Sequence, residues 1–568
     1  MCVRDRQVTR LPGKTAEKAR ALLARRLKAF AREEDGTLLI FGVYVFLIIL
    51  MMGGIGIDMM RFERDRTNLQ YTLDRAVLAA ADLDQTLDPQ SVVEDYFAKA
   101  GLAQYLSGVT VTEGLGFRNV QATATADIKT QFMHMGGVDT LAAPANSTAE
   151  ESIGSVEISL VLDVSGSMNS NSRLTNLKSA ARDFVDQMVD NTEDGKMSMS
   201  IIPYATQVSL PGDFLDRFNV SDEHDFSHCV NFNSAAFDST ALDDSTELTR
   251  TMHFDIWSGS STDRRPSNGL VPYPVCEHAS ARETLIMQKD RNTLKNFITN
   301  LSARGNTSID LGMKWGTALL DPSVRAATNA LIGQGDVPAD FASRPSAFND
   351  GDTLKVIVLM TDGQNTSQYY VDDDFRTGGS TVWWNDSQEH YSIYDPARNQ
   401  YYWRNAKSWP IYASSYWHDH PYGNGTYTKC GWYYYGNCRD ATYNVSEAGS
   451  ATELEFAELW ARTSVQYNRR RNMEPWMGYY DARDEWYYDV RRYVGSSTKN
   501  SRTKDICDAA KAAGTIVYTI GFEAPYSGQV VLADCASSAA HYFDVDGLEI
   551  TEAFASIASS IRKLRLTQ

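Results

Sequence analysis

The pattern of apolar and polar positions separates an apolar segment near the N-terminus from a long region of alternating short apolar runs and amphipathic segments. The apolar segment, Leu38–Ile57, is twenty residues long and carries no charge. At about 1.5 Å rise per residue, a helix of this length spans the roughly 30 Å hydrocarbon core of a bilayer. The alternatives are a buried core helix and a cleaved signal peptide, whose apolar core is shorter, about 7–15 residues. We predict a transmembrane anchor over residues 37–57, in a helix that continues to about residue 82.

Residues 83–150 are predicted to form a small helical and β segment. A helix is expected from Gln90 to Gly101, because Pro89 is well placed to start it. Apolar and polar residues alternate between Val109 and Thr130, which predicts a β-hairpin or small sheet. The polar stretch Asn146–Gly154 is predicted to be a linker.

From residue 151 to residue 568, predicted strands and helices alternate, as in a parallel sheet with crossover helices. Two apolar runs, Ile158–Leu162 and Leu354–Met360, are rich in branched residues, as buried central strands are. Further helices are predicted at 174–189, 293–301, 309–320, 503–513 and 550–564, and further strands at 197–203, 515–522 and 541–543. The fold class is therefore predicted to be α/β, with a doubly wound, mostly parallel sheet.

Two stretches break this alternation and are predicted to be insertions, at about 213–282 and 367–501. The first is polar and carries two cysteines; the second holds nine of the eleven tryptophans and runs such as Trp432–Tyr435. Tyrosine and tryptophan supply large, rigid contact area, so one interpretation is that these aromatic residues form a recognition surface. We favour the other, in which they form the core of a loop-rich subdomain closed by a Cys430–Cys438 disulfide.

Charge is distributed unevenly along the chain. The net charge of −18 argues against nucleic-acid binding, yet residues 1–35 hold ten Lys and Arg against five acids. Five of these basic residues directly precede the apolar span: Arg20, Arg25, Arg26, Lys28 and Arg32. Since positive charge favours the cytoplasmic side, residues 1–36 are predicted to be a cytoplasmic tail, and everything after the anchor lies on the opposite side.

The seven cysteines agree with this placement. Cys2 is predicted to be cytoplasmic and unpaired, which leaves an even number in an oxidising compartment. Proximity in the sequence favours Cys229–Cys276, Cys430–Cys438 and Cys507–Cys535, although six cysteines allow fifteen pairings. A zinc site is the alternative for Cys229 and Cys276, because His228 and His278 stand nearby.

Candidate chemistry begins where the first apolar strand ends, in the sequence DVSGS. Asp163, Ser165 and Ser167 alternate with other residues, so an extended or tightly turned loop aims all three the same way. One carboxylate and two hydroxyls form an oxygen-only set that suits Mg²⁺ or Mn²⁺. A plain surface turn is the alternative interpretation.

Two further loops offer the remaining ligands. Asp362 follows the strand Leu354–Met360, and Thr307 stands just before a predicted helix. The alternative interpretation is that Thr307 or Ser308 caps this helix. In an open α/β sheet, ligands bind at the carboxyl ends of the strands, so these loops are expected to converge. We predict a Mg²⁺ (or Mn²⁺) site formed by Asp163, Ser165, Ser167, Thr307 and Asp362.

These five residues resemble the metal-ion-dependent adhesion site (MIDAS) of von Willebrand factor A (VWFA) domains. The resemblance covers about residues 156–564, apart from the two insertions. It implies a von Willebrand factor A domain over 151–568, in which the five residues coordinate Mg²⁺, some through water. It also implies a free coordination position for an acidic group of a partner.

A second resemblance covers nearly the whole chain. GTLLIFGVYVFLIILMMGGIGIDMMRFERDRTNLQ resembles the N-terminal anchor of TadG-like proteins from the bacterial tight-adherence (Tad, Flp) pilus system. TSIDLGMKWGTALLDP, IVYTIGF and AFASIASSIRKLRLTQ resemble the A-domain segments of that family. The resemblance implies a single-pass protein of the bacterial inner membrane, with a periplasmic A domain that acts in pilus assembly or cell adhesion.

The sequence points to binding rather than catalysis. It contains no nucleotide-binding G-x-x-x-x-G-K loop and no G-x-S-x-G nucleophile elbow, and nothing near the two serines supplies a base. We therefore expect no enzyme and no small-molecule substrate, but a metal-dependent contact with a carboxylate of a pilus or envelope protein. Two alternatives remain open: an envelope scaffold whose metal only stabilises the domain, and a metal-assisted hydrolase.

Overall fold

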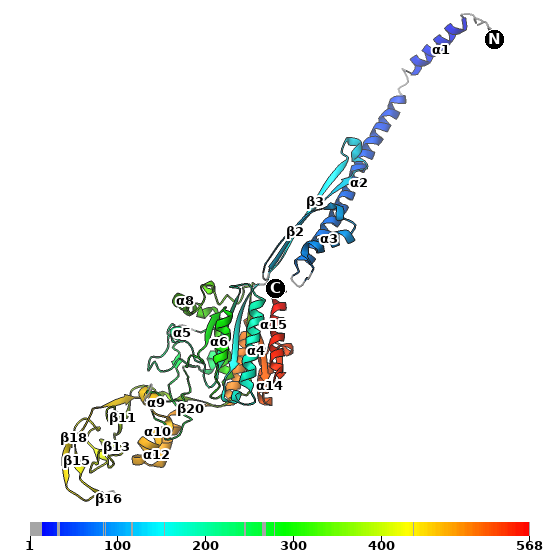
Figure 1. The fold of residues 1–568 in the computed structure, drawn as a ribbon. Helices are drawn as coiled ribbons and strands as arrows, with labels where there is room; N and C mark the ends of the chain where they lie inside the picture. Colours follow the sequence, from blue (N-terminus) through cyan, green and yellow to red (C-terminus); the bar gives the residue numbers. More distant parts are fainter. Residues whose placement is uncertain are drawn as a thin grey trace. The chain divides into compact units, whose positions relative to one another are not determined.

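The computed structural model describes residues 14–30, 35–82, 85, 87–114, 117–152, 154–242, 246–263, 269–277, 279–350, 352–435 and 437–566 (Figure 1). Residues 1–13 and 31–34 of the predicted cytoplasmic tail, with Cys2 and Arg32, lie outside these residues, and so does His278. The chain divides after Ser152 into two compact units. Each unit is described by itself.

The first unit contains the predicted apolar helix. It comprises α1 (Lys14–Phe30) and the 47-residue α2 (Asp35–Ala81). Among the described residues, α2 is the one helix long and apolar enough to cross a membrane, between Thr37 and Ala81. Most apolar side chains of its N-terminal stretch, such as Phe41 (67% exposed) and Met52 (70% exposed), are exposed. This is the pattern expected of a helix surrounded by lipid, and it supports a single membrane anchor.

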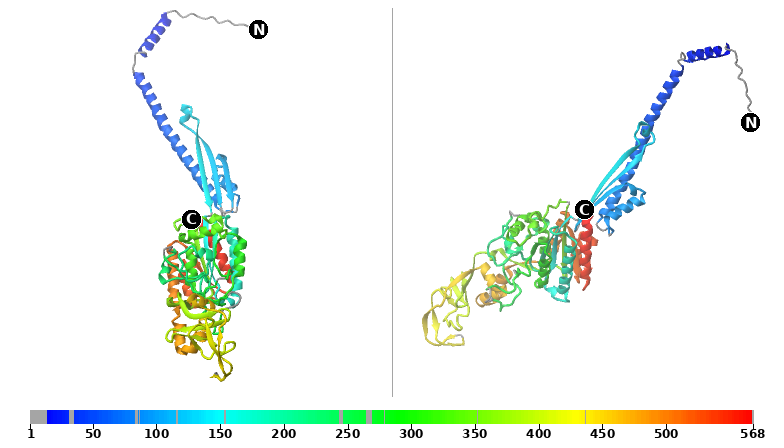
Figure 2. Two further views of the ribbon diagram at one scale, coloured as in Figure 1. Left: turned by 90° about the vertical axis from the view of Figure 1, so that its left-hand side faces the viewer. Right: turned by 45° about the horizontal axis from the view of Figure 1, so that its top comes forward.

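The rest of the first unit packs on the C-terminal half of α2 (Figures 1 and 2). A short helix, α3, is capped by Asp88, whose carboxylate accepts a hydrogen bond of 2.9 Å from the backbone N–H of Ser91. A three-stranded antiparallel sheet has the order β1-β2-β3. Leu73, Val77 and Phe97 form part of the shared core. The bounds are α3 (Pro89–Lys99), η1 (Ala103–Tyr105), β1 (Leu106–Gly114), β2 (Phe117–Lys129), η2 (Met133–Gly136) and β3 (Thr140–Ser152).

The predicted linker at 146–154 is wrong, because most of it belongs to β3. This strand pairs with β2 along its whole length, for example Ala145 with Ala124. Ala143 and Ala145 are buried, while polar residues alternate with them. Alanine gives a weak apolar signal, so this alternation did not stand out as a strand.

The second unit is built on a six-stranded sheet with the order β22-β21-β9-β4-β5-β8. All neighbouring strands are parallel except β8, which runs antiparallel to β5 at the edge. The bounds are β4 (Ser155–Asp163), β5 (Met197–Tyr204), β8 (Leu285–Gln288), β9 (Thr353–Thr361), β21 (Ile516–Phe522) and β22 (Tyr542–Val545). Numbered along the chain, the order is 3-2-1-4-5-6, so the winding direction reverses between β4 and β9. The predicted doubly wound α/β arrangement is present.

Helices cover both faces of this sheet. One face carries α4 (Arg173–Asp190), α6 (Arg291–Asn300) and α15 (Glu549–Leu566), which share an aliphatic core with β4 and β9. The other carries α7 (Ile309–Ala318), α8 (Arg325–Gln334), α13 (Ser496–Ala512) and α14 (Tyr526–Cys535). The short η3 (Gly166–Asn169), η5 (Pro322–Val324), η6 (Ala339–Phe341) and η10 (Ala539–His541) lie in the connections.

Helix α7 approaches the sheet closely at Gly316. A Cβ on Gly316 would stand 2.5 Å from Cγ2 of Val161, so a larger residue would push α7 away from β4. The backbone carbonyl of Gly316 also accepts a 2.6 Å hydrogen bond from the hydroxyl of Ser159. This contact fixes α7, and with it the loop that carries Thr307, against the central strand.

The first insertion merges with the main core. It contains α5 (Gly212–Leu215), β6 (Val230–Asn231), η4 (Ser234–Asp238) and β7 (Thr249–Arg250). Its phenylalanines Phe214, Phe232 and Phe237 are buried in the same cluster as residues of β5 and α7. Cys229 and Cys276 form a disulfide, as the sequence favoured, so they are not zinc ligands.

The second insertion shares one hydrophobic core with the first insertion, through residues such as Phe254 and Ile256, and has a smaller core of its own around Trp403. Its largest sheet is antiparallel, with the order β14-β13-β12-β11-β19. Trp403 and Trp460 are fully buried, whereas Trp409 and Tyr435 are 79% and 86% exposed. The buried rings confirm that aromatic residues form a core here, and the recognition surface stays a prediction for the exposed ones. Cys430–Cys438 closes its tip, and the third predicted pair, Cys507–Cys535, joins α13 to α14.

The elements of the second insertion follow in chain order. They are β10 (Gln368–Val371), η7 (Asp373–Phe375), β11 (Gly379–Asn385), β12 (His390–Asp395), β13 (Gln400–Trp403), β14 (Trp417–His418), β15 (Thr426–Cys430), β16 (Tyr433–Tyr434), β17 (Asn437–Cys438), β18 (Thr442–Ser446), β19 (Ala451–Glu455), α9 (Phe456–Arg462), α10 (Val465–Tyr467), η8 (Asn468–Met473), α11 (Glu474–Met477), α12 (Tyr479–Arg483), η9 (Asp484–Tyr488) and β20 (Arg491–Val494).

Candidate metal centre

Asp163 ends β4 at the carboxyl edge of the sheet and is fully buried. Its Oδ1 accepts the backbone N–H of Ser165 at 2.7 Å, and its Oδ2 accepts the hydroxyl of Thr361 at 2.6 Å. Thr361 is the last residue of β9, the neighbouring strand. The carboxylate is therefore held at the point where the winding direction of the sheet reverses, which is where open α/β sheets bind ligands.

The two serines connect this carboxylate to the second one. The Oγ atoms of Ser165 and Ser167 are 3.0 Å apart. Ser167 also donates to Oδ1 of Asp362 at 2.7 Å. Asp163, Ser165, Ser167 and Asp362 thus form one continuous cluster of oxygens across two loops.

Thr307 stands on a third loop, beside the residue that follows Asp362. Its Oγ1 lies 3.7 Å from the position of a Cβ on Gly363, the neighbour of Asp362. Its backbone N–H bonds to the hydroxyl of Thr366 at 2.9 Å. Helix capping does not explain this loop: the N-cap of α7 is Ser308, whose side chain makes no capping hydrogen bond and donates to a backbone carbonyl instead.

A buried lysine that the sequence analysis missed ties two of these loops together. Lys499, on α13, is fully buried and donates to the carbonyl of Thr307 at 2.7 Å and to that of Thr366 at 2.9 Å. It also donates to the hydroxyl of Ser308 at 2.6 Å. Asp310, likewise fully buried, interacts electrostatically with the ammonium group. Lys499 therefore acts as a fixed cross-link behind the candidate ligands.

A second basic residue, Arg173, contacts the site from the N-terminus of α4. Its Nη1 lies 2.9 Å from Oδ2 of Asp362, and its Nε lies 2.9 Å from Oε2 of Glu523. Arg173 thereby orients Asp362 and balances part of its charge. Its position at the start of a helix gave no signal in the sequence.

The electrostatics of the cluster favour a bound cation. Burial, and then the charge of Asp362, raise the pKa of Asp163 to about 7. A positive ion between two buried carboxylates removes both penalties, because it replaces lost hydration and repulsion with attraction. The donors are all oxygens, which is the preference of Mg²⁺ and Mn²⁺.

The existing hydrogen bonds decide how the donor set could hold such an ion. Both oxygens of Asp163 already accept protein hydrogen bonds, so this residue is better suited to hold an ion through water than to contact it directly. Within the described part of the chain, no group of three or more His, Cys, Asp or Glu side chains is arranged for a metal. The candidate site therefore depends on its hydroxyls.

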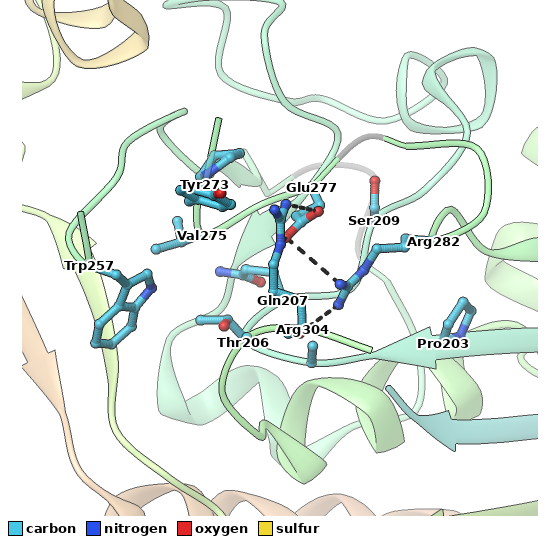
Figure 3. A pocket seen from close by; sticks show the side chains of 13 residues that line it. Pro203, Thr206, Gln207, Ser209, Trp257, Tyr273, Val275, Glu277, Arg282 and Arg304 are labelled. Carbon is cyan, nitrogen blue, oxygen red and sulfur yellow. Dashed lines mark hydrogen bonds and ion pairs between the residues drawn. The ribbon is translucent and has the colours of Figure 1, made fainter. Parts of the chain in front are cut away.

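A pocket of about 50 Å³ lies beside the site, between the first insertion and the loop before α7 (Figure 3). Gly305 lines it and also accepts a 2.9 Å hydrogen bond from the backbone N–H of Gly166, in the DVSGS loop. Trp257 and Tyr273 lie at its sides and are 45% and 50% exposed. A pocket of this size is far smaller than the roughly 300–1,000 Å³ of small-molecule sites. It has room for the end of one side chain.

The pocket carries an excess of positive charge. Arg304 pairs with the carboxylate of Glu277 and stacks over the ring of Tyr273 at 4.9 Å (Figure 3). Arg282 lies 3.8 Å from the same carboxylate and donates to the carbonyl of Arg304 at 2.8 Å. Two guanidinium groups thus share one carboxylate. The hydroxyl of Ser209 is buried there and has no hydrogen-bond partner among the described residues.

Solved structures with some similarity to the chain include three from bacterial pili. The von Willebrand factor domain of the type V pili tip protein Mfa5 from Porphyromonas gingivalis is 13% identical, with 72% of this chain and 96% of that chain covered and a TM-score of 0.30. The pilus adhesin SpaC from Lactobacillus rhamnosus GG is 12% identical, with 80% and 33% covered and a TM-score of 0.29. The PilB minor pilin from Streptococcus sanguinis is 12% identical, with 82% and 78% covered and a TM-score of 0.26. Scores this low do not establish a common fold, so the fold is argued from the order of the sheet alone.

No curated protein matches the sequence. A family does match at the N-terminal end: residues 36–83 fit the Tad family, described as "Putative Flp pilus-assembly TadE/G-like". The match covers the apolar stretch of α2 and its extension to the end of the helix. The resemblance predicted from the anchor sequence is therefore confirmed for residues 36–83, which are similar to the TadE/G-like family.

Proposed function

We propose that this protein is a membrane-anchored component of a bacterial Flp (Tad) pilus system that binds a partner through a divalent cation. In this proposal, the second unit is a von Willebrand factor A domain. Asp163, Ser165, Ser167, Thr307 and Asp362 hold Mg²⁺ or Mn²⁺, and a carboxylate of a pilus or envelope protein completes the coordination. The cation supplies the attraction for that carboxylate, and the chain supplies its position.

The observation that carries the proposal is the convergence of three loops at one point of the sheet. Asp163 and Asp362 follow adjacent parallel strands, and Ser167 bridges from one loop to the other. Thr307 is brought to the same place by α7, which Gly316 allows to lie close to β4. The meeting of side chains that are so far apart in the sequence is typical of a functional site.

The surroundings of the site support an acidic partner. The neighbouring pocket places the guanidinium groups of Arg282 and Arg304 against the single carboxylate of Glu277. This local positive excess stands in a chain whose net charge is −18. The positive charge of the pocket attracts an acidic segment of a partner and repels a basic one.

The proposed location follows from α2 and the charges before it. In this proposal the TadE/G-like segment is a single-pass anchor in the inner membrane, and the basic residues before it support a cytoplasmic N-terminus. The second unit then lies in the periplasm, where an oxidising environment suits its three disulfides.

The test is the variant Asp163→Ala in the full-length protein. We expect it to lose chelator-sensitive capture of envelope proteins and to impair pilus formation, because a buried ligand to the cation is gone. Circular dichroism and the three disulfides should be unchanged. Asp546→Ala, at an exposed aspartate after β22, is the matched control and should behave as the wild type.

A second function, that of an envelope scaffold, is favoured by one observation. Protein contacts already hold the candidate loops: Lys499 joins two of them, and Arg173 links Asp362 to Glu523. The scaffold predicts that Mg²⁺ raises the melting temperature of the wild type and that Asp163→Ala removes this increase but leaves capture and pili intact. In that case the cation stabilises the domain, and the hypothesis of recognition by the site is wrong.

A further inference from the structure

The loop that joins β2 to β3 in the first unit lies against α2 (Figures 1 and 2). The two strands stay paired up to Lys129 and Thr140, so residues 131–138 form the tip of a complete hairpin. This tip is directed along α2 toward the apolar stretch of the helix, away from α3.

Three contacts fix the height of the tip on α2. The carboxylate of Asp58, 2% exposed, accepts backbone N–H groups of Phe132 at 2.7 Å and of Met133 at 2.8 Å. A Cβ on Gly54 would stand 2.4 Å from Cγ of Phe132, so the ring rests directly on the helix backbone. One turn earlier, Cε of Met51 lies 3.3 Å from the position of a Cβ on Gly136.

These contacts place the tip beside the end of the predicted membrane span. Met51 and Gly54 belong to the uncharged stretch Leu38–Ile57, and Asp58 is the first charged residue after it. From Met51 to Asp58 the helix rises about 10 Å, at about 1.5 Å per residue. If Leu38–Ile57 fills a hydrocarbon core of about 30 Å, the tip stands at the depth of its outer third and the adjoining headgroups.

The side chains of the tip suit that depth. Met135 is 61% exposed and Val138 is 39% exposed, although each is a large apolar residue. His134 and Asp139, hydrogen-bonded at 3.2 Å, and the exposed Lys129 lie among or next to them. Apolar residues with charged groups close by match the boundary between acyl chains and headgroups.

The backbone of the tip is also suited to a medium with little water. Besides the two bonds to Asp58 described above, Gln131 donates to the same carboxylate at 3.0 Å. Met135 donates to the carbonyl of Phe132, and Val138 donates to that of Met133. Unpaired backbone groups are costly in lipid, and a loop that pairs its donors internally avoids that cost.

We propose that residues 131–138 insert into the lipid bilayer beside α2, on the side where the helix leaves the membrane. The first unit then has two attachments to the membrane, the helix and the hairpin tip. Because the sheet is packed on α2, the second attachment fixes the tilt and rotation of the first unit relative to the bilayer. The occupant of the exposed apolar surface is phospholipid, and another protein or a second copy of this chain is the competing occupant.

The test uses a fluorescent label that senses its surroundings. Full-length Met135→Cys, in a Cys2→Ser background, is labelled with NBD and reconstituted into phosphatidylcholine–phosphatidylglycerol vesicles; the other six cysteines are in disulfides. We expect blue-shifted emission that nitroxide-bearing lipids quench. Ile49→Cys on α2 is the positive control, and Thr110→Cys, exposed on β1, is the aqueous control.

Each outcome decides the proposal. Quenching at Met135 comparable to that at Ile49 supports it. Emission like that of Thr110, with Ile49 quenched, overturns it, because the helix is then embedded and the tip is not. Blue-shifted emission without quenching by lipid also overturns it and assigns the surface to a protein neighbour. The experiment needs no divalent cation, so its failure is distinct from failure of the proposed metal site.

Discussion

The carboxyl edge of the six-stranded sheet and the aromatic insertion are built in opposite ways. At the sheet edge, loops from distant parts of the chain meet around buried charges such as Asp163 and Lys499. In the insertion, β11 to β14 are neighbours in the chain and in an antiparallel sheet, which β19 joins from a later segment. Its core is aromatic, with Trp403 against Tyr422 and Tyr427. The sheet edge depends on long-range contacts, and the insertion depends mainly on local ones.

This difference indicates that the two regions tolerate damage separately. A change in a buried charge at the sheet edge should alter cation binding without disturbing the aromatic core. A change inside the insertion should alter its own stability and leave the candidate ligands in place. Each prediction below either supports this separation or contradicts it.

The largest effect is expected from Lys499→Met. The methionine keeps the length of the side chain but leaves three acceptors and the carboxylate of Asp310 without their cation, which should lower the free energy of unfolding by about 3–5 kcal/mol. Because the loop of Thr307 is then released, affinity for Mg²⁺ or Mn²⁺ should fall about 10–100-fold. Calorimetric titration and chemical unfolding measure the two effects.

The matched control for that variant is Lys504→Met on the same helix. Lys504 is exposed and pairs with Asp508 and Asp534 at the surface, so neither affinity nor stability should change noticeably. An unchanged cation affinity in Lys499→Met would show that the loops hold their positions without the lysine. The sheet edge would then not depend on this long-range contact.

The sequence predicted the parts of the sheet edge that carry strong local signals. Continuous branched runs marked β4 and β9, and an acid directly after each strand marked Asp163 and Asp362. The predicted strands and helices around them agree with the structure to within a few residues, with the exception of α13. That helix begins at Ser496, seven residues before the predicted start, because its first turns are polar.

Other parts of the site gave no local signal. Lys499 falls within the predicted insertion 367–501, in the last part that the structure assigns to α13, and the partners that stabilise its buried charge are brought together only by the fold. Arg173 pairs with Asp362 across 189 residues, and its role depends on where α4 starts. Strand β8 has four residues and an antiparallel direction at the edge, so neither its length nor its pattern marked it.

A smaller effect, confined to the insertion, is expected from acid. His390 is buried, and this burial lowers its pKa from 6.5 to about 4. Since the folded pKa lies below the unfolded one, the neutral ring contributes its full stability above about pH 6.5 and loses it as the pH falls toward 4. The loss between about pH 7.5 and about pH 5 should be about 2 kcal/mol.

His390→Phe should remove this part of the acid sensitivity while the ring contact with Tyr422 is kept. Tryptophan fluorescence during urea unfolding reports on the insertion, because nine of the eleven tryptophans lie within residues 367–501. Cation affinity of the variant at neutral pH should equal that of the wild type. A loss of affinity would mean that the insertion and the sheet edge are coupled, contrary to the separation argued above.

The smallest effect is expected at the margin of the site, in the pocket of the first insertion. Arg282→Gln removes one of the two guanidinium groups that share Glu277, so capture of the partner that depends on Asp163 should weaken about tenfold, or about 1.4 kcal/mol. Glu277→Gln should act in the opposite direction, because both guanidinium groups then face the partner. A gain of affinity is not explained by damage to the fold. If both variants bind like the wild type, the pocket takes no part in recognition, and the cation with its five protein ligands is sufficient.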